Sequence, residues 1–273
     1  MTSTPTPAAD ERTARAADKA APGVTPGAAA HRLRLLDLCS KAGGASMGYH
    51  QAGFDVTGVD IDPQPRYPFT FIQADALEVL ADQAFMTQFD AVAASPPCQA
   101  FSLAQRIQGR THPDLIEPVR DRLTALGLPY VIENVVGAPL HDPVELCGCM
   151  FPGLNVYRER LFEFGHWPGI TQPAHRQHTE PLVKMGRPPV PGHRMHVVGN
   201  FSGVAQARAA MGIGWMVRDE LREAIPPAFT RHIGQALHTH LTSRNPARAA
   251  AAVQLAIPVQ LDLVHLAEQE ATR

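Results

Sequence analysis

The chain has 273 residues, of which 45% are hydrophobic, and its formal net charge is −2. This composition suits one globular domain with small appendages. It excludes a globally basic molecule, so any binding of nucleic acid must depend on a local positive field. Four scattered cysteines exclude a disulfide framework and favour a reduced, cytoplasmic compartment. No apolar run approaches the roughly 18 residues of a membrane span, so we expect no membrane segment.

Apolar runs punctuated by turn residues predict the buried strands of a parallel sheet. These runs span residues 33–37, 55–61, 69–73, 89–94 and 130–135. Helical spacing of apolar residues follows at 115–126, 205–211 and 227–241. This succession is typical of an α/β fold with a doubly wound, mostly parallel sheet.

A glycine-rich turn, which contains Gly43 and Gly44, follows the first strand. Such a turn lets a ligand approach the backbone closely, although a purely structural turn explains it equally well. Acids stand at or just after the carboxyl ends of the first three strands, at Asp37, Asp60 and Asp75. Together they favour a ligand rich in hydroxyls and amines over one rich in phosphates, because acids repel phosphates.

Cys98 follows the fourth strand, which Pro96 and Pro97 stop because proline lacks the donor of the strand ladder. Its sulfur is therefore expected at the mouth of the sheet, where α/β proteins place ligands. A lone cysteine is often a small buried hydrophobe, but the flanking Ser-Pro-Pro and Gln99 argue against burial here.

A second landmark is the tip of the fifth strand, which carries Glu133 and Asn134. A charge within a buried parallel strand is costly unless it has a role or a partner. Between the two landmarks, the loop over 100–113 contains glycine, Arg106, Arg110 and a histidine. It suits a mobile loop that closes over an anionic substrate, with a solvated surface loop as the alternative.

Several short motifs follow one another along the chain, each occurring once. They are DLCSKAGGASMG, VDID at 59–62, PPCQ at 96–99, ENV at 133–135, RER at 158–160, RAAMGIGWM and AIPPAFTRHIGQAL. Through this ordered set, which covers about 33–241, the chain resembles the C5-cytosine DNA methyltransferase family. It departs from the family pattern at Cys39 (usually Phe), Lys41 (usually Gly), Val156 (usually Gln) and residues 222–223 (usually Gly-Asn).

The resemblance implies a methyltransferase-type sheet that uses S-adenosyl-L-methionine. Asp60 would bind the ribose hydroxyls, Ile61 would pack on adenine, and Asp75 with Ala76 would hold the adenine edge. The two glycines would let the methionine part lie against the backbone. The expected cofactor-binding residues are Asp37, Cys39, Gly43, Gly44, Asp60, Ile61, Asp75, Ala76 and Pro96.

The implied reaction is methyl transfer to C5 of a cytosine that has been flipped out of duplex DNA. By the resemblance, Cys98 is the nucleophile that adds to C6, and Glu133 donates to N3. Arg158 and Arg160 provide fixed donors, and Arg160 would hold the base O2. The expected substrate-binding residues are Gln99, Ser102, Arg106 and Asn134.

The resemblance also divides the chain. We expect a disordered tail over 1–30, a catalytic and cofactor-binding core over 31–164, a short target-recognition segment over 165–203, a C-terminal part of the core over 204–241, and a second tail with helical potential over 242–273. Residues 155–208 carry seven Lys or Arg against three Asp or Glu, which is the footprint that a phosphate backbone requires. The small segment predicts a short or degenerate target site.

Cys147 and Cys149 with His175 and His178 suggest zinc, but Cys-x-Cys is a poor match to the usual ligand spacing, so we expect no metal. We expect a monomer that acts on double-stranded DNA, with a cognate restriction endonuclease as a candidate partner. Two alternatives stay open. One is an RNA (tRNA) cytosine methyltransferase, and the other is a relative that binds nucleic acid without turnover.

Overall fold

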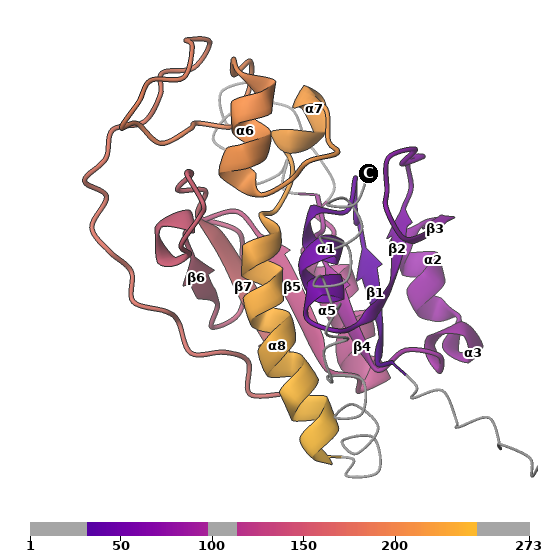
Figure 1. Cartoon of the computed structure of the whole chain (residues 1–273). Helices are drawn as coiled ribbons and strands as arrows, with labels where there is room; N and C mark the ends of the chain where they lie inside the picture. The colour runs from indigo at the N-terminus through magenta and orange to yellow at the C-terminus, as the bar shows by residue number, and fades with distance from the viewer. Residues whose placement is uncertain (1–31, 98–113, 245–273) are drawn as a thin grey trace, which may run out of the picture.

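The computed structural model describes residues 32–97 and 114–244, which build a seven-stranded sheet with helices on both faces (Figure 1). The strand order is β3-β2-β1-β4-β5-β7-β6. Five strands pair in parallel: β1 (Arg34–Leu38), β2 (Asp55–Asp60), β3 (Thr70–Gln73), β4 (Ala91–Ala94) and β5 (Tyr130–Asn134). The other two, β6 (Val144–Leu146) and β7 (Arg160–Gly165), are antiparallel to their neighbours.

The sheet confirms the predicted α/β class with a doubly wound, mostly parallel sheet, and all five predicted strands lie within two residues of their expected bounds. The sequence analysis did not predict β6 and β7. The predicted tail over 1–30, the loop over 100–113 and most of the predicted tail over 242–273 lie outside the described residues. Within the described ranges, no helix combines the length and the hydropathy needed to cross a bilayer.

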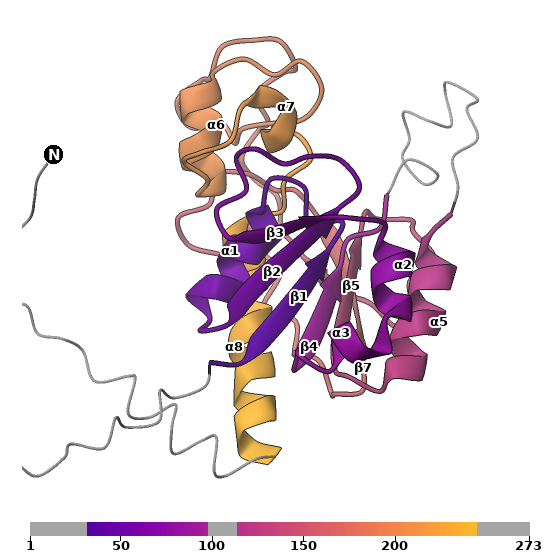
Figure 2. The same ribbon diagram turned by 90° about the vertical axis from the view of Figure 1, so that its right-hand side faces the viewer.

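The two faces of the sheet carry separate hydrophobic clusters, because successive side chains of a strand point to opposite faces. Leu35, Ala93 and Val131 pack with α1 (Gly44–Gln51) and α8 (Pro227–Arg244). The alternate positions, which include Leu36 and Ile132, pack with α2 (Ala76–Ala81), α3 (Gln83–Met86) and α5 (Ile116–Leu126). Figure 2 shows α1 and α8 on one side of the sheet and the other three helices on the opposite side.

Gly44 and Gly48 of α1 are required by the close approach of α8 and of the residues just before it. A Cβ at Gly48 would lie 2.0 Å from Thr230 Oγ1 and 2.2 Å from the Pro227 carbonyl oxygen. A Cβ at Gly44 would lie 2.6 Å from the Ile225 carbonyl oxygen. The absence of side chains here lets the Thr230 hydroxyl donate to the Ala45 carbonyl at 2.8 Å. The glycine pattern therefore has a structural cause as well as any role in binding a ligand.

A third hydrophobic cluster builds a small region, residues 180–224, which we call the upper lobe and which lies above the sheet in Figure 1. It combines α6 (Val204–Met211) and α7 (Arg218–Leu221) with apolar side chains from the irregular chain before them, including Val183, Met195 and Phe201. The predicted boundary between 203 and 204 falls inside this cluster. From 166 to 203 the backbone has no helix or strand and a single isolated bridge, Leu182 to Arg194.

Candidate active site

A cavity of about 260 Å³ opens at the carboxyl ends of β1, β4 and β5. One wall is the turn after β1, which includes Lys41 and Gly44. The second wall contains Pro96, Glu133 and Arg160. The third wall contains Met216, Glu220 and residues 222–225. The carboxyl edge of a doubly wound sheet is the usual place for a ligand. The cavity thus joins the glycine turn to two of the residues that sequence analysis assigned to catalysis.

Glu133 and Arg160 form an ion pair on the wall of this cavity. Glu133 Oε1 lies 3.0 Å from Arg160 Nε, and both side chains are largely buried. Burial raises the pKa of Glu133 above its usual value, while Arg160, a hydrogen bond with Ser95 and the charge of Arg158 act in the opposite direction. A carboxyl group with a raised pKa keeps its proton at higher pH, so it can act as a donor to a bound base.

Asn134 holds the chain that leaves β4. Its side-chain amide donates to the Pro96 carbonyl oxygen at 3.0 Å, and its side-chain oxygen accepts from the Val135 N–H at 2.9 Å. Asn134 lines the cavity, but these bonds make it a positioning residue for the Pro-Pro turn. Pro97 also lines the cavity and is the last described residue on this side. The expected site residues that follow it, Cys98, Gln99, Ser102 and Arg106, lie outside the described residues.

Arg158 connects the chain before β7 to the upper lobe. Its guanidinium donates to the carbonyl oxygens of Ala224 at 2.6 Å, Val197 at 2.9 Å and Arg222 at 2.7 Å. Arg158 does not line the cavity, whereas Arg160 does. Three of its five N–H groups are thus used in positioning the backbone, and the catalytic role that the resemblance implies for Arg158 stays a prediction.

Asp37 lies at the end of β1, beneath the turn. Its Oδ2 accepts a hydrogen bond from the Ser46 hydroxyl, which in turn accepts one from the Tyr67 hydroxyl at 2.8 Å. Its Oδ1 is buried and has no hydrogen-bond partner among the described residues. Burial raises the pKa of Asp37 to about 7; the Ser46 bond lowers it, and the charges of Glu133 and Asp60 raise it further. An unsatisfied acceptor at this point favours a ligand that brings a donor.

Asp60, at the end of β2, holds the turn after β1 through a hydrogen bond to its side chain. Its Oδ2 accepts from the Lys41 backbone N–H at 3.0 Å, and its Oδ1 accepts from the Asp62 N–H at the same distance. Lys41 has φ +45° and Cys39 has φ +56°, both in the left-handed region that favours glycine. The glycine that the resemblance expects at Lys41 is explained by this conformation. Burial raises the pKa of Cys39 to about 12, so this thiol stays protonated at neutral pH.

The remaining expected cofactor residues lie along the sheet edge outside the cavity. Ile61 follows β2 and is 65% exposed, which is unusual for a large apolar side chain. Asp75 caps α2, since its Oδ1 accepts from the N–H groups of Leu77 at 2.7 Å and Glu78 at 3.2 Å. Ala76 begins the same helix, and Gly43, with φ +82°, caps α1. The structure therefore does not bring these residues into the same cavity as Glu133.

The sequence analysis gave no site role to the third wall of the cavity. Met216, Glu220, Glu223 and Ile225 line it, and the Trp215 indole N–H donates to the Ala42 carbonyl at 2.8 Å. Glu220 also pairs with Arg66, whose Nη2 lies 2.8 Å from its Oε1. The only signals in the sequence were the two closing motifs, which do not reveal which of their side chains turn toward the sheet.

The charges around the cavity suit a cationic ligand that carries an amine and hydroxyls. The lining contains three acids and three bases (Glu133, Glu220, Glu223; Lys41, Arg160, Arg222), and the buried Asp37 and Asp60 behind the turn add negative charge. S-adenosyl-L-methionine, which bears a sulfonium and an ammonium, fits this donor and acceptor set. The turn with its unsatisfied Asp37 oxygen would hold the amine-bearing part.

The strand order and the position of the cavity define an α/β protein with a ligand site at the carboxyl edge of a mostly parallel sheet. Within that class, residues 33–116 match the family model described as C-5 cytosine-specific DNA methylase. Through this segment, the chain is similar to the C-5 cytosine-specific DNA methylase family. The match includes the glycine turn, Asp60 and the PPCQ motif.

Two relatives are similar to part of the chain. Type II methyltransferase M.AquIA from Picosynechococcus sp. is 33% identical over 122 residues, which are 38% of this chain and 49% of that protein. Type II methyltransferase M1.HphI from Haemophilus parahaemolyticus is 35% identical over 130 residues, which are 40% of this chain and 34% of that protein. The matched parts thus span half or less of these relatives.

Solved structures superpose only loosely. A mutant of Spodoptera frugiperda DNMT2 gives a TM-score of 0.36 at 18% identity and covers 48% of each chain. S. pombe Dnmt2 methyltransferase gives the same TM-score at 20% identity and covers 52% of each chain. The fold assignment therefore depends on the strand order of the sheet.

Proposed function

We propose that this chain is an S-adenosyl-L-methionine-dependent DNA (cytosine-5)-methyltransferase that acts on a cytosine flipped out of the duplex. One observation carries the proposal: a single cavity is lined by the glycine turn, by the Glu133–Arg160 pair and by Pro97, directly before Cys98 in the chain. Two similar proteins are named type II methyltransferases, which makes a cognate restriction endonuclease a candidate partner.

The chemistry explains why a thiol, a carboxyl group and a guanidinium are needed together. C5 of cytosine is too weak a nucleophile, so the Cys98 thiolate adds to C6 and the C5=C6 electron pair moves onto C5. Glu133, whose pKa is raised, donates to N3 and stabilises the charge that develops there. Arg160 holds Glu133 and presents its remaining donors toward the base.

The bound cofactor supplies an electrophilic methyl group to C5. A base then takes the C5 proton. The C–H electron pair forms the C5=C6 double bond, and the C6–S bond breaks with its electron pair on the Cys98 thiolate, so the free enzyme is regenerated. Asn134 contributes by holding the Pro96 carbonyl, which sets the point from which the nucleophile's chain starts. A displacement of that starting point by about 1 Å costs about 10²-fold in rate in well-positioned active sites.

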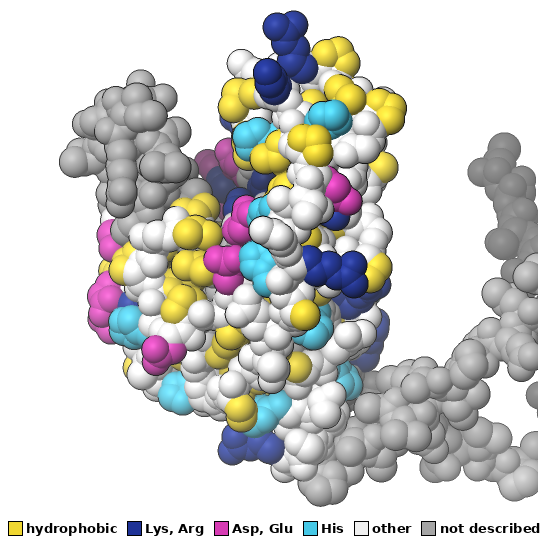
Figure 3. Space-filling model, turned by 90° about the vertical axis from the view of Figure 1, so that its left-hand side faces the viewer, with side chains coloured by type: hydrophobic (Ala, Val, Ile, Leu, Met, Phe, Trp, Pro, Cys, Tyr) yellow, Lys and Arg dark blue, Asp and Glu magenta, His cyan; other side chains and the backbone are white. Residues whose placement is uncertain are grey.

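The upper lobe and the chain that leads to it are the proposed contact surface for DNA. Arg176, Lys184 and Arg187 are exposed, and so are the apolar Leu182, Met185 and Val190. Figure 3 shows Lys and Arg side chains at the tip of this lobe and along one edge of the molecule, with hydrophobic side chains between them. Exposed bases contact phosphates, and the small lobe leaves few side chains for base edges, so the target site is expected to be short.

The test measures tritium transfer from labelled S-adenosyl-L-methionine to duplex DNA and to transfer RNA in parallel. We expect transfer to DNA, its loss in Cys98→Ser, and a reduction of about 10²–10⁴-fold in Glu133→Gln, which keeps the side-chain volume but loses the acidic proton. Duplex DNA with 5-fluorocytosine should be trapped covalently by the wild type and not by Cys98→Ser. Asp55→Asn, at an exposed position at the start of β2, is the control for a general loss of activity through folding.

Each other outcome selects a different function. Transfer to transfer RNA alone would replace the DNA proposal with the RNA alternative. Binding of duplex DNA without transfer to either substrate would indicate a non-catalytic relative. Transfer that persists in Cys98→Ser would remove this residue from the nucleophile role. Once transfer to DNA is shown, bisulfite sequencing of DNA from an expressing host identifies the target site.

A further inference from the structure

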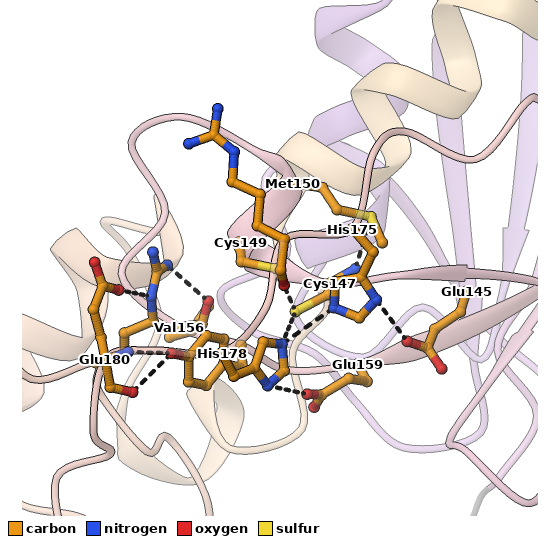
Figure 4. A network of polar contacts seen from close by, with 12 residues as sticks. Glu145, Cys147, Cys149, Met150, Val156, Glu159, His175, His178 and Glu180 are labelled. Carbon is orange, nitrogen blue, oxygen red and sulfur yellow. Dashed lines mark hydrogen bonds and ion pairs between the residues drawn. The ribbon is translucent and has the colours of Figure 1, made fainter.

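Four side chains with metal-ligating atoms meet beside β6, away from the cavity (Figure 4). Cys147 and Cys149 come from η1 (Gly148–Met150) and the residue before it, while His175 and His178 come from the irregular chain after β7. Cys147 Sγ lies 3.2 Å from His178 Nε2 and 3.2 Å from Cys149 Sγ, and the Nε2 atoms of the two histidines are 3.1 Å apart. All four ligand atoms lie within 4.8 Å of one another.

We propose that Cys147, Cys149, His175 and His178 form a structural zinc site. With Zn–S bonds of about 2.3 Å and Zn–N bonds of about 2.0–2.1 Å, a tetrahedron has edges of about 3.8 Å between sulfurs and about 3.3 Å between nitrogens. The observed separations of 3.2 and 3.1 Å differ from these edges by about 0.6 Å or less. The remaining pairs lie within 4.8 Å, so side-chain rotations that move ligand atoms by about 1 Å bring all four onto one tetrahedron.

The outer contacts of the histidines match those of zinc ligands. His175 Nδ1 lies 3.5 Å from Glu145 Oε1, and His178 Nδ1 lies 3.6 Å from Glu159 Oε1. A carboxylate beside one ring nitrogen draws the proton to that nitrogen and leaves the other free to bind the metal, which is the usual arrangement around zinc. In both rings the nitrogen that faces the cluster is Nε2. Two independent histidines thus present the same ligand atom.

A cation also resolves an electrostatic conflict within the cluster. With the protons on Nδ1, two Nε2 lone pairs face each other at 3.1 Å and also face sulfur. Lone pairs brought this close repel unless a donor or a cation lies between them. The ring of Tyr157 stacks on the His178 imidazole at 3.7 Å with 15° between the planes, which keeps that nitrogen directed at the cluster.

The Cys-x-Cys spacing, which argued against a metal in the sequence, is accommodated by the glycine between the cysteines. A Cβ at Gly148 would lie 2.1 Å from the Val156 carbonyl oxygen, so only glycine lets the chain turn this tightly here. The turn brings Cys149 Sγ back to within 3.2 Å of Cys147 Sγ. The sequence analysis expected no metal from this spacing, but spacing alone did not reveal that the turn brings the four ligand atoms together.

Four protein ligands complete a tetrahedron, which indicates a structural role and not a catalytic one. None of the four residues lines the cavity between the glycine turn and Glu133. They instead join the η1 turn to a stretch that has no helix or strand from 166 to 203. A small region without regular structure commonly needs a metal or a disulfide to fix it. The zinc ion would anchor this stretch in its first half, at His175 and His178.

The experiment measures metal content of the full chain purified under reducing conditions and dialysed against a weak chelator. We expect about one zinc per chain, and loss of about nine-tenths or more of it in Cys147→Ser and in His178→Gln. His193→Gln, a histidine of the same irregular stretch outside the cluster, should keep the full content. Loading the metal-free chain with Co²⁺ should give the visible bands of a tetrahedral site and thiolate-to-cobalt charge transfer.

The partly exposed Cys149 and His175 provide further variants if Cys147→Ser fails to fold, because circular dichroism identifies such a failure. Zinc retained in Cys149→Ser and His175→Gln would overturn the proposal, as would a reduced wild-type chain that binds no zinc on titration. A Cys147–Cys149 disulfide in the freshly isolated chain would also overturn it. The metal measurement needs neither DNA nor cofactor, so its outcome is independent of the proposed methyl transfer.

Discussion

The parallel sheet and the upper lobe are held in place in different ways. In the sheet, β1, β2, β4 and β5 each contribute side chains to two clusters on opposite faces, so the geometry results from many contacts. The upper lobe has a smaller cluster, which meets the rest of the chain through Ala42 and Val156. Named polar contacts add to this packing: Arg158 to three carbonyls, Trp215 to Ala42, and Arg66 to Glu220. A region fixed by few ties can be repositioned by one substitution, whereas a region fixed by packing changes mainly in stability.

The largest effect on the sheet side is expected from Arg120→Met. Arg120 donates from Nε and Nη2 to the two carboxylate oxygens of Glu163, both at 2.8 Å, and both residues are buried. Removal of the guanidinium leaves Glu163 buried without a counterion, which costs about 3–5 kcal/mol of unfolding free energy. Denaturant unfolding followed by circular dichroism measures this loss.

A double variant is the control for the Arg120 result. Arg120→Met with Glu163→Gln removes both charges and keeps an acceptor for the His141 N–H, which donates to Glu163 at 2.8 Å. Most of the lost stability should return in the double variant. A single variant that loses less than about 1 kcal/mol would show that packing alone fixes this part of the sheet.

The next largest expected effect is the pH dependence of the free energy of unfolding, which comes from Asp37 at the junction of the two regions. The pKa of Asp37 is raised to about 7 in the folded chain from 3.8, chiefly by burial. Between these values the folded state binds a proton that the unfolded state lacks, so stability is greatest below the unfolded pKa and falls as pH rises toward 7. The free energy of unfolding changes by up to about 1.4 kcal/mol per pH unit, so it falls by about 2–3 kcal/mol between pH 5 and 7.

Asp37→Asn should flatten this profile, because the amide keeps an acceptor for the Ser46 hydroxyl but does not titrate. Thermal or denaturant midpoints at pH 5, 6 and 7 provide the measurement. Asp55→Asn, at an exposed position at the start of β2, is the matched control and should leave the slope unchanged. Equal slopes in Asp37→Asn and wild type would refute the assignment of the titration to Asp37.

The smallest expected effect is confined to the upper lobe. Arg158→Ala removes donors from three carbonyl oxygens, and a hydrogen bond to a charged group contributes about 1.5–3 kcal/mol. We expect hydrogen-exchange protection over 195–225 to fall by about 2 kcal/mol, while β1 to β5 keep theirs. Arg158→Lys should not restore protection, because one ammonium cannot reach three carbonyls. Equal loss of protection in the sheet would remove the distinction between the two regions.

The difference between the regions also explains what the sequence could predict. The parallel strands β1, β2, β4 and β5 are buried on both faces, so each is a largely apolar run that can be recognised without knowing its neighbours. By contrast, β7 carries Arg160 and Glu163, whose partners Glu133 and Arg120 are distant in the sequence. Charges that are neutralised by remote residues make a buried strand look like a surface segment.

Prediction of the candidate site from the sequence has the same limit, because partners that are distant in the chain cannot be recognised. Glu133 stood out because a charged residue interrupts an apolar strand, and the structure places it on the cavity wall with Arg160. The adjacent motif residue Arg158 could not be separated from Arg160 by sequence, because only the backbone at φ +49° turns it toward carbonyls. The sequence suggested the Cys and His residues as zinc ligands, but their meeting could not be predicted, because the two halves lie about 26 residues apart and meet through irregular chain.

The bond from Asn134 to the Pro96 carbonyl has a consequence for protein engineering. It belongs to the rigid frame of β4 and β5, so whatever chain is spliced in after Gln99 inherits the same starting point. If the chain acts as proposed, loop grafts from C-5 cytosine-specific DNA methylases should alter substrate choice while the proposed reacting groups keep their mutual placement. A graft that binds DNA but loses trapping of 5-fluorocytosine would argue that this frame does not govern the nucleophile.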